Sequence, residues 1–506
     1  MSLRRTAISS VLWSAIENGS VTVVSFLSLI LFAKVLGPRD FGVYSVAIAV
    51  IEVAGIFTNM FFHDSLIRHT NATARHFNSA FTASIILGLT FCVILYLLFP
   101  YCAMLIDDPR IVPVGRVMAL ALLFSAPASI LNAHQSREFG FRLLAMRTLF
   151  GRLAGAFLGI AAALFGLGVW ALVIQFLAMT ALGAATLFAF SGWRPRLTTN
   201  LSPIIDLLDY SVGAVVSLAS NFLTKRAFIF FAGSFLGVAQ AGLLNLAFRL
   251  VDTVWAISAT ALSQVLLPTM SRMQHDLART LRAYGTTLSL GCLVLFPIFC
   301  GIGLLSSELI LLLFGSKWSD ASEPAFWLSL LVFAQCPRIF CVTLLNVGGY
   351  IGLSSRANLI TLGYMAVIIA ATRLPSVQWA LAAWCSSEVL NYLLLQYDTN
   401  SKFRISLLEF ASKIAPSAIA SCIMIVVVTW LRGYVSDYTP IARLLLLSLT
   451  GMLAYAFSLV LFGRDQVFRL ATDLVASSET GSDSRLGRLI STLDNFLRRS
   501  RRDVRP

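Results

Sequence analysis

Charged residues are scarce in this sequence. Asp, Glu, Lys and Arg make up only 12% of its 506 residues, against about 25% in ordinary soluble domains, whereas 58% of the residues are hydrophobic. The mean hydropathy is +0.82. A water-soluble core of this length cannot enclose so much apolar surface, so the composition indicates a protein that uses the lipid bilayer as its solvent.

Several motifs that carry chemistry are also missing. None of the eight cysteines stands in a CxxC pair and nearly all lie in apolar runs, so we interpret them as packing residues, not as metal ligands or disulfides. No GxxxxGKS or GxxxxGKT loop occurs, and no loop is long enough for an ATPase domain. His63, His69 and His76 are spaced too irregularly to bind a metal. We therefore expect no metal, no cofactor and no nucleotide hydrolysis.

The basic residues lie mostly between the apolar segments. The formal net charge is +14, but the Lys and Arg residues occupy short loops and the C-terminal region, which does not resemble a nucleic-acid-binding surface. Alternate loops are the richer ones, for example those carrying Arg137, Arg142 and Arg147, and then Arg194 and Arg196. Cytoplasmic loops follow this pattern. We therefore expect a multi-pass membrane protein with both termini in the cytoplasm.

The apolar segments are long enough to cross a membrane, which takes about 20 residues. The sequence predicts an all-α polytopic membrane protein with about 14 transmembrane helices, at 10–33, 41–62, 79–100, 114–134, 148–166, 169–191, 210–232, 240–262, 284–305, 325–346, 357–372, 377–396, 412–430 and 440–462.

The C-terminal region after the last span is basic. Apolar residues recur at helical spacing between Arg485 and Arg502, with polar and basic residues between them. This pattern is typical of an amphipathic helix on an anionic membrane surface, and a disordered basic tail is the alternative.

An internal repeat is visible at an offset of 200 residues. Segment 36–52, LGPRDFGVYSVAIAVIE, aligns without a gap with segment 236–252, LGVAQAGLLNLAFRLVD. The match includes two glycines of each segment and places Glu52 opposite Asp252. Both copies connect an odd span to the next even span, so the two halves share one orientation, as in parallel repeats. We predict six-helix lobes at 1–200 and 201–400, two additional helices within 401–462, and a cytoplasmic tail at 463–506.

Two motifs resemble those of a known family. AKVLGPRDFGVYSVA, at 33–47, is similar to the segment that follows the first span in polysaccharide flippases, and LLLFGSKWSDASEPAFWLSLL, at 311–331, is similar to the outer loop before their tenth span. The chain is thus identified as a member of the multidrug/oligosaccharidyl-lipid/polysaccharide exporter superfamily, in its oligosaccharide-lipid flippase branch. The resemblance covers most of 6–462.

This resemblance implies a fold and a substrate. It implies two pseudo-symmetric six-helix lobes around a central cavity, lined largely by spans 1, 2, 7 and 8 and opening alternately to the two sides of the membrane. The implied substrate is an oligosaccharide joined by pyrophosphate to a polyprenyl lipid, whose tail stays in the bilayer. Spans 13 and 14 form a groove for that tail in some relatives.

Charged residues inside the predicted spans are the candidate functional residues. A charge at mid-membrane costs about 2.5–3.5 kcal/mol on the insertion scale, so it faces the protein interior or water. Eight residues are the clearest cases, and six of them fall in spans 1, 2, 7 and 8: Glu17, Glu52, Lys225, Arg226, Arg249, Asp252, Arg338 and Glu388. We interpret Glu388 as pairing within the C-terminal lobe, and Arg116 and Arg152, near predicted helix ends, as snorkelling.

The residue types suit an anionic, sugar-bearing head group. Arginine forks match phosphate oxygens and lysine supplies a point charge, so the candidate pyrophosphate contacts are Lys225, Arg226, Arg249 and Arg338. Candidates for bonding sugar hydroxyls are Asn18, Asn59, Asn221 and Asn245, for which interhelical hydrogen bonding is at least as good an account. The acids Glu17, Glu52 and Asp252 either bind a coupling cation or serve as counter-ions. Arg249 and Asp252, three residues apart, are also able to neutralise each other.

The leading hypothesis is a flippase that translocates polyprenyl-pyrophosphate-linked oligosaccharide for exopolysaccharide, capsule or lipopolysaccharide biosynthesis, not an enzyme. Its partners would be the lipid-linked oligosaccharide, membrane lipids and a polysaccharide polymerase with its co-polymerase, with no nucleic acid. A multidrug exporter of the same superfamily is the first alternative, but the central spans hold at least as many bases as acids. A membrane glycosyltransferase or polymerase is less favoured because every outer loop is short.

Overall fold

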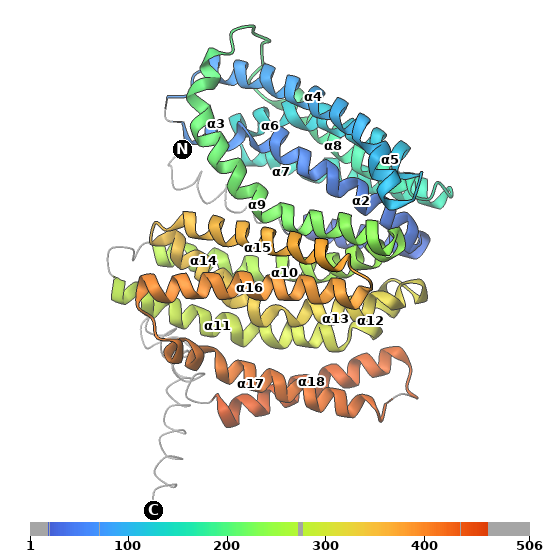
Figure 1. Ribbon diagram of the computed structural model, residues 1–506, viewed down its shortest axis with the longest axis vertical. Coiled ribbons are helices and arrows are strands. Elements are labelled where there is room, and N and C mark those ends of the chain that lie inside the picture. Colours follow the sequence, from blue (N-terminus) through green and yellow to red (C-terminus); the bar gives the residue numbers. More distant parts are fainter. Residues whose placement is uncertain (1–18, 20, 70, 272–276, 436, 464–506) are drawn as a thin grey trace, which may run out of the picture. The chain divides into compact units, whose positions relative to one another are not determined.

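The chain is a succession of helices (Figure 1). The computed structural model describes residues 19, 21–69, 71–271, 277–435 and 437–463, and describes 208–221, 259–271 and 277–279 by their backbone alone. All regular structure in this part of the chain is helical. The predictions for Glu17, Asn18 and the amphipathic tail helix therefore lie outside the described residues, as does the side chain of Asn221.

An apolar helix covers Val21–Val35. The elements that follow it are α2 (Pro38–Gly55), η1 (Ile56–Met60), α3 (His63–Arg68), α4 (Ala74–Ile106), α5 (Ile111–Ala119), α6 (Ala121–Arg137), α7 (Phe141–Leu164), α8 (Trp170–Phe190), η2 (Ser202–Ile204), α9 (Ile205–Leu236), α10 (Val238–Ser271), α11 (Leu277–Leu304), α12 (Ser306–Leu313), η3 (Ser316–Ala321), α13 (Ser322–Leu330), α14 (Val332–Val347), α15 (Ile351–Thr372), α16 (Val377–Phe403), α17 (Leu407–Arg432) and α18 (Pro440–Phe462).

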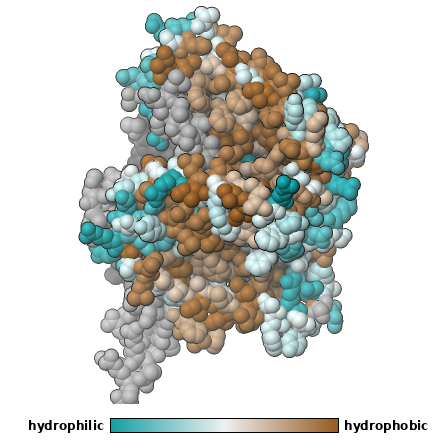
Figure 2. Space-filling view, viewed as in Figure 1, coloured by the Kyte–Doolittle hydropathy of each residue, from teal (hydrophilic) through white to brown (hydrophobic). Residues whose placement is uncertain are grey.

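The helices confirm an all-α, multi-pass membrane protein. Within the described residues, 10 helices are long and apolar enough to cross a membrane, or 11 if the pair Ser316–Leu330 and Val332–Val347, bent by 43°, forms one span. Residues 21–33 of the first predicted span and the predicted spans at 210–232 and 377–396 also coincide with helix, but the helices there are not among those that meet this measure. On the face drawn in Figure 2, hydrophobic side chains gather over the middle of the helices and hydrophilic ones toward their ends, as a bilayer requires.

Two compact units make up the chain. The first comprises Met1–Thr260, Leu309–Leu328 and Gly352–Asn391, and the second comprises Ala261–Glu308, Ser329–Ile351 and Tyr392–Pro506. The first holds α2 to α9 and most of α10, and the second holds α11, α14, α17 and α18. The lobe boundaries inferred from the repeat stay a prediction.

Small residues set the spacing of α7 and α8 in the first unit. Gly151, Gly155 and Gly159 recur every four residues, which places them on one face of α7. A Cβ on Gly155 would lie 2.7 Å from the carbonyl oxygen of Gln175 on α8. The two backbones therefore touch, as they do where small residues recur at this spacing in membrane helices.

The two copies of the repeat pack against each other through glycines. A Cβ on Gly42 of α2 would overlap the carbonyl group of Val238, the first residue of α10. A Cβ on Gly242 of α10 would overlap the carbonyl oxygen of Pro38, the first residue of α2. Positions 38 and 238 are equivalent in the repeat, as are 42 and 242, so the contact is reciprocal. Each helix start fits against the other helix only because a glycine there has no side chain.

In the second unit, α17 and α18 are fastened to α11 and α12. The carboxylate of Glu308, 3% exposed, accepts hydrogen bonds from Arg432 at 2.9 Å and from Arg443 at 2.8 Å. The Tyr455 hydroxyl on α18 donates to the carbonyl of Leu293 on α11 at 2.8 Å. Two arginines on one buried carboxylate hold the ends of the added helix pair against the helices before it.

Replacing Gly42 by alanine tests the reciprocal contact. The new methyl group would meet a backbone carbonyl at a helix start, which cannot move aside as a side chain can. We expect a loss of about 1–3 kcal/mol of stability, seen as a lower melting temperature of the detergent-solubilised protein.

The matched control is Gly363→Ala on α15, where a Cβ meets nothing within 4 Å. Alanine there is expected to be neutral or to stabilise the helix by up to about 1 kcal/mol. Equal melting temperatures for the two variants would contradict the glycine contact.

Candidate functional site

Two ion pairs join α2, α9 and α10 in the first unit. Arg226 of α9 pairs with Glu52 of α2, and its neighbour Lys225 pairs with Asp252 of α10. The side chains are 23% and 41% exposed in the first pair and 25% and 58% in the second. These residues therefore border open space, although they lie on apolar helices. The two acids, at equivalent places of the repeat, each form an ion pair with a residue of α9.

Aromatic rings flank the same network. The ammonium group of Lys225 lies 4.4 Å from the ring centroid of Phe248, and the guanidinium carbon of Arg249 lies 5.8 Å from that of Tyr44. Asp252 has Lys225 as its ion-pair partner. It is therefore not paired with Arg249 on the same helix face, as the spacing allowed. Arg249 instead reaches back toward α2.

Arg226 and Glu52 line a cavity of about 320 Å³, here termed the ion-pair cavity. Its other walls are mainly apolar and come from α2, η1, α6, α8 and α9: Ile51, Gly55, Ile56, Asn59, Met60, Ala121, Leu122, Ser125, Phe176, Thr180 and Phe222. Among the described residues that line this cavity, Glu52 is the only carboxylate.

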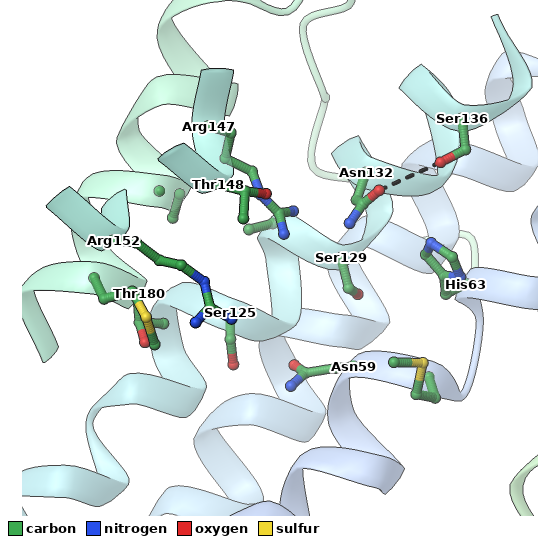
Figure 3. Close-up of a pocket in the computed structure, with 15 residues that line it drawn as sticks. Asn59, His63, Ser125, Ser129, Asn132, Ser136, Arg147, Thr148, Arg152 and Thr180 are labelled. Atoms are coloured by element: carbon green, nitrogen blue, oxygen red, sulfur yellow. Dashed lines mark hydrogen bonds between the residues drawn. The ribbon is translucent and has the colours of Figure 1, made fainter. Parts of the chain in front are cut away.

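A second cavity of about 440 Å³ adjoins the first and shares Asn59, Met60, Ser125 and Thr180 with it. We term it the arginine cavity (Figure 3). Its polar lining is Asn59 of η1, His63 of α3, Ser125, Ser129, Asn132 and Ser136 of α6, Arg147, Thr148 and Arg152 of α7, and Thr180 of α8. Within the part of the chain that the structure describes, two arginines and no carboxylate line this cavity.

The polar wall on α6 follows from the helical repeat. Ser125, Ser129, Asn132 and Ser136 are spaced by four, three and four residues, which places them along one face of the helix. Ser129 donates to the carbonyl of Ala126 at 2.7 Å, and Ser136 donates to the side-chain oxygen of Asn132 at 3.3 Å. Hydroxyl protons used within the helix leave oxygen lone pairs for a ligand that donates.

Arg147 and Arg152 reach the cavity from α7. In Figure 3 both side chains extend from α7 toward the polar face of α6, where Asn132 and Ser125 lie. Arg152 also donates to the hydroxyl oxygen of Ser25. The interpretation of Arg152 as a snorkelling residue near a helix end was wrong, because α7 begins at Phe141 and Arg152 lies in its interior. Arg116 does lie at the surface, over the Tyr96 ring at 4.0 Å.

The remaining predicted residues are distributed unevenly. Asn59 lines both cavities. Asn245 is 5% exposed, and its amide nitrogen has no hydrogen-bond partner among the described residues. Arg338 lies on α14 in the second unit and lines neither cavity. The prediction did not include Arg147, Asn132 or the serines of α6, although the spacing of the serines is visible in the sequence.

The fold is that of membrane transporters. The solved structure of the lipid II flippase MurJ in its inward closed conformation matches with a TM-score of 0.71 at 15% identity, covering 90% of this chain and 100% of that one. The inward-facing form of a multidrug resistance transporter of the MATE family, in the MOP superfamily, matches with a TM-score of 0.59 at 12% identity, covering 76% and 94%.

Sequence comparison places the chain within one family. The family model described as polysaccharide biosynthesis protein matches residues 31–323, more than half of the chain, and the chain belongs to that family. This confirms the resemblance carried by segment 33–47.

Curated relatives agree with this assignment. The succinoglycan biosynthesis transport protein ExoT of Rhizobium meliloti is 25% identical over 317 residues, the lipopolysaccharide biosynthesis protein WzxC of Escherichia coli 22% over 323, and the teichuronic acid biosynthesis protein TuaB of Bacillus subtilis 21% over 322. Each match covers 63% of this chain and 64%, 65% and 67% of the respective relative, so the similarity spans about two thirds of their length.

A double-mutant cycle tests the pair between Glu52 and Arg226. Glu52→Gln leaves the guanidinium without its carboxylate on apolar helices, so we expect the single variant to lose stability. Adding Arg226→Met removes the orphaned charge and should restore part of that loss, giving a coupling energy of about 1 kcal/mol or more by thermal or chemical unfolding.

The control cycle joins Glu52→Gln to Lys225→Met. These two residues are not partners, so their effects should be closer to additive than those of the true pair. Equal coupling in both cycles would show that the charges act through the local field and not as specific pairs.

Proposed function

We propose that the protein is a flippase that moves an oligosaccharide linked by pyrophosphate to a polyprenyl lipid across the bacterial inner membrane. The product would enter exopolysaccharide, capsule or lipopolysaccharide biosynthesis. The names of the relatives support the pathway, since one is a succinoglycan transport protein and others serve lipopolysaccharide and teichuronic acid biosynthesis. The fold shared with a lipid II flippase supports the type of transport.

The observation that carries the proposal is the charge of the two adjoining cavities. Their described lining residues include Arg147, Arg152 and Arg226 and one carboxylate, Glu52. A pyrophosphate is an anion that arginine binds with paired N–H donors. A cavity with this balance inside membrane-spanning helices lowers the cost of bringing such a head group through the bilayer.

The ion pairs supply a route to reversible binding. While no substrate is present, Glu52 neutralises Arg226 and Asp252 neutralises Lys225, so the helices do not carry bare cations. A phosphate group that reaches these cations competes with the carboxylates, and its departure lets the pairs close again. The head group would cross by alternating access while the polyprenyl tail stays in the lipid, and a polymerase with its co-polymerase would remove the product.

Export of a cationic drug, the activity of the structurally similar multidrug transporters, suits this lining less well. A cationic substrate needs acidic groups. Among the described residues of the two linings, Glu52 is the single acid, and it already has Arg226 beside it.

Alanine at Arg226 or at Arg249 tests the proposed function. In a host that lacks its own flippase but makes the matching lipid-linked unit, we expect each variant to lower surface polysaccharide at least tenfold and to leave lipid-linked precursor in the cell. The protein level in the membrane is measured in parallel.

Arg116→Ala, which removes a surface arginine from a membrane-spanning helix, is the control and should export normally. Full polysaccharide output from both Arg226→Ala and Arg249→Ala would rule out their proposed part in substrate binding.

Reporter fusions test the proposed orientation. With the N-terminus in the cytoplasm, the connection at Gly166–Gly168 lies outside and the segment around Arg194 and Arg196 lies inside. Alkaline phosphatase fused after Leu167 should be active and after Arg196 inactive, and green fluorescent protein at the C-terminus should fluoresce. The reverse activities would overturn the assignment of both termini to the cytoplasm.

A further inference from the structure

A short segment between α12 and α13 is anchored to the first unit by one aromatic side chain. Gly315, with a φ of +92°, turns the chain into η3. Of the described residues 315–320, Trp318 alone is buried, with 0% of its surface exposed, whereas its neighbours on both sides are exposed. Residues 315–320, here termed the η3 strap, therefore lie on the surface with the Trp318 indole inserted beneath them.

The indole joins the strap to the beginning of the chain. Its Nε1–H donates to the carbonyl oxygen of Ala33, 285 residues earlier, at 2.8 Å, and its ring meets that of Phe41 edge-on, with centroids 4.9 Å apart. Ala33 lies in the last turn of the helix Val21–Val35, where carbonyl groups have no donor within the helix, and Phe41 lies in the first turn of α2. Both residues are at most 1% exposed. Trp318 thus closes a buried contact between three helix ends.

The first unit is closed at this end and hollow further along. The backbones of α2 and α10 touch at their starts, at Pro38 and Val238. The two cavities are instead lined by residues beyond the middle of α2 and in the segments after it, from Ile51 to His63. In the proposed orientation the helix starts and the η3 strap face the outside, so this conformation is closed to the outside and its cavities lie toward the cytoplasm.

We propose that Trp318 is the latch of an outer gate. Its indole holds the η3 strap on the start of α2 while the protein is closed to the outside, and it leaves this position when that side opens. The inference rests on the alternating access of the proposed function, and it adds a positioning residue that does not touch the substrate. One neutral hydrogen bond and one edge contact between rings are enough to bias an equilibrium between two conformations, yet can be broken in every cycle.

The strap is the part that is suited to move. Arg110, in the connection between α4 and α5, pairs with Asp108 at 2.7 Å and lies 3.6 Å from Asp40 in the first turn of α2. The start of α2 is thereby held by residues of its own half. The strap begins at Gly315, which has no Cβ and accepts a change of backbone angles at little cost. Its departure breaks the contacts of Trp318 and leaves the ion pairs of Arg110 intact.

Distances between two spin labels test the latch in the purified full-length protein. The labels are placed at Lys317→Cys on the strap and at Lys34→Cys beside Ala33, two exposed positions. Cys385 and Cys422, the two cysteines that are not buried, are first replaced by serine, and this parent without added cysteines shows the background of labelling.

The variants Trp318→Phe and Trp318→Ala are then compared in nanodiscs. Phenylalanine keeps a ring beside Phe41 but lacks the indole N–H. We expect it to raise the population with the longer distance about threefold to tenfold, the effect of one neutral hydrogen bond. Alanine removes both contacts and should raise that population further.

Trp327→Ala is the matched control. Trp327 lies on α13, the helix that follows the strap, and is 46% exposed, so its loss should leave the distance distribution unchanged. The melting temperature of each variant is measured in parallel, and Trp318→Phe provides the decisive comparison if Trp318→Ala does not fold.

Unchanged or shorter distances in the folded Trp318 variants would overturn the latch, as would an equal change in Trp327→Ala. The measurement needs neither substrate nor transport. A protein whose distances respond to Trp318 but which exports no polysaccharide would refute the proposed function. One that exports polysaccharide while its distances ignore Trp318 would refute only the latch.

Discussion

The contact between Gly42 and Gly242 is the constraint on which the site depends. The carbonyl group of Val238 packs directly against Gly42, and that of Pro38 packs directly against Gly242. The starts of α2 and α10 are therefore fixed against each other. Ten residues further along each helix, a rise of about 15 Å, stand Glu52 and Asp252. Their places relative to each other therefore follow from two positions where no Cβ is tolerated. A charge network on apolar helices needs this accuracy, because an ion pair that opens there leaves a charge without a partner.

Much of the fold can be predicted from the hydropathy and the repeat. The predicted spans fall on helices because a bilayer demands long apolar segments and gives the backbone no alternative to helix within them. The 200-residue repeat also identifies Glu52 and Asp252 as equivalent acids from the sequence alone. What the sequence could not supply was the partner of each charge. Arg249 stands at an ideal spacing from Asp252, yet Asp252 is held by Lys225, since helix packing brings α9 beside α10 and the choice between neighbours depends on that packing.

The arginine cavity shows the same limit from another direction. The position of Arg152 was predicted wrongly because the predicted span 148–166 begins seven residues after the start of α7. An interior residue of the helix was therefore placed near its end. The serine spacing on α6 was readable, but a polar stripe faces a cavity, a neighbour or lipid headgroups with equal ease. The packed structure shows that the stripe and the arginines border one cavity. The positions of the helices can be predicted from the hydropathy of the sequence. The residues of a site depend on which helix faces pack together.

The cations that pair with the two acids of the repeat both come from its second half. In the second half, Lys225 and Arg226 are consecutive residues of α9, about 100° apart around the helix, so one reaches Asp252 and the other reaches Glu52. At the same offset the first half has Ser25 in place of Lys225, and the group that reaches Ser25 is Arg152 of α7. Within the described residues, both acids of the repeat are thus paired through α9, whereas the cation that meets the position equivalent to Lys225 comes from α7. The repeat therefore places the two acids alike, but the cations around them depend on how the other helices pack.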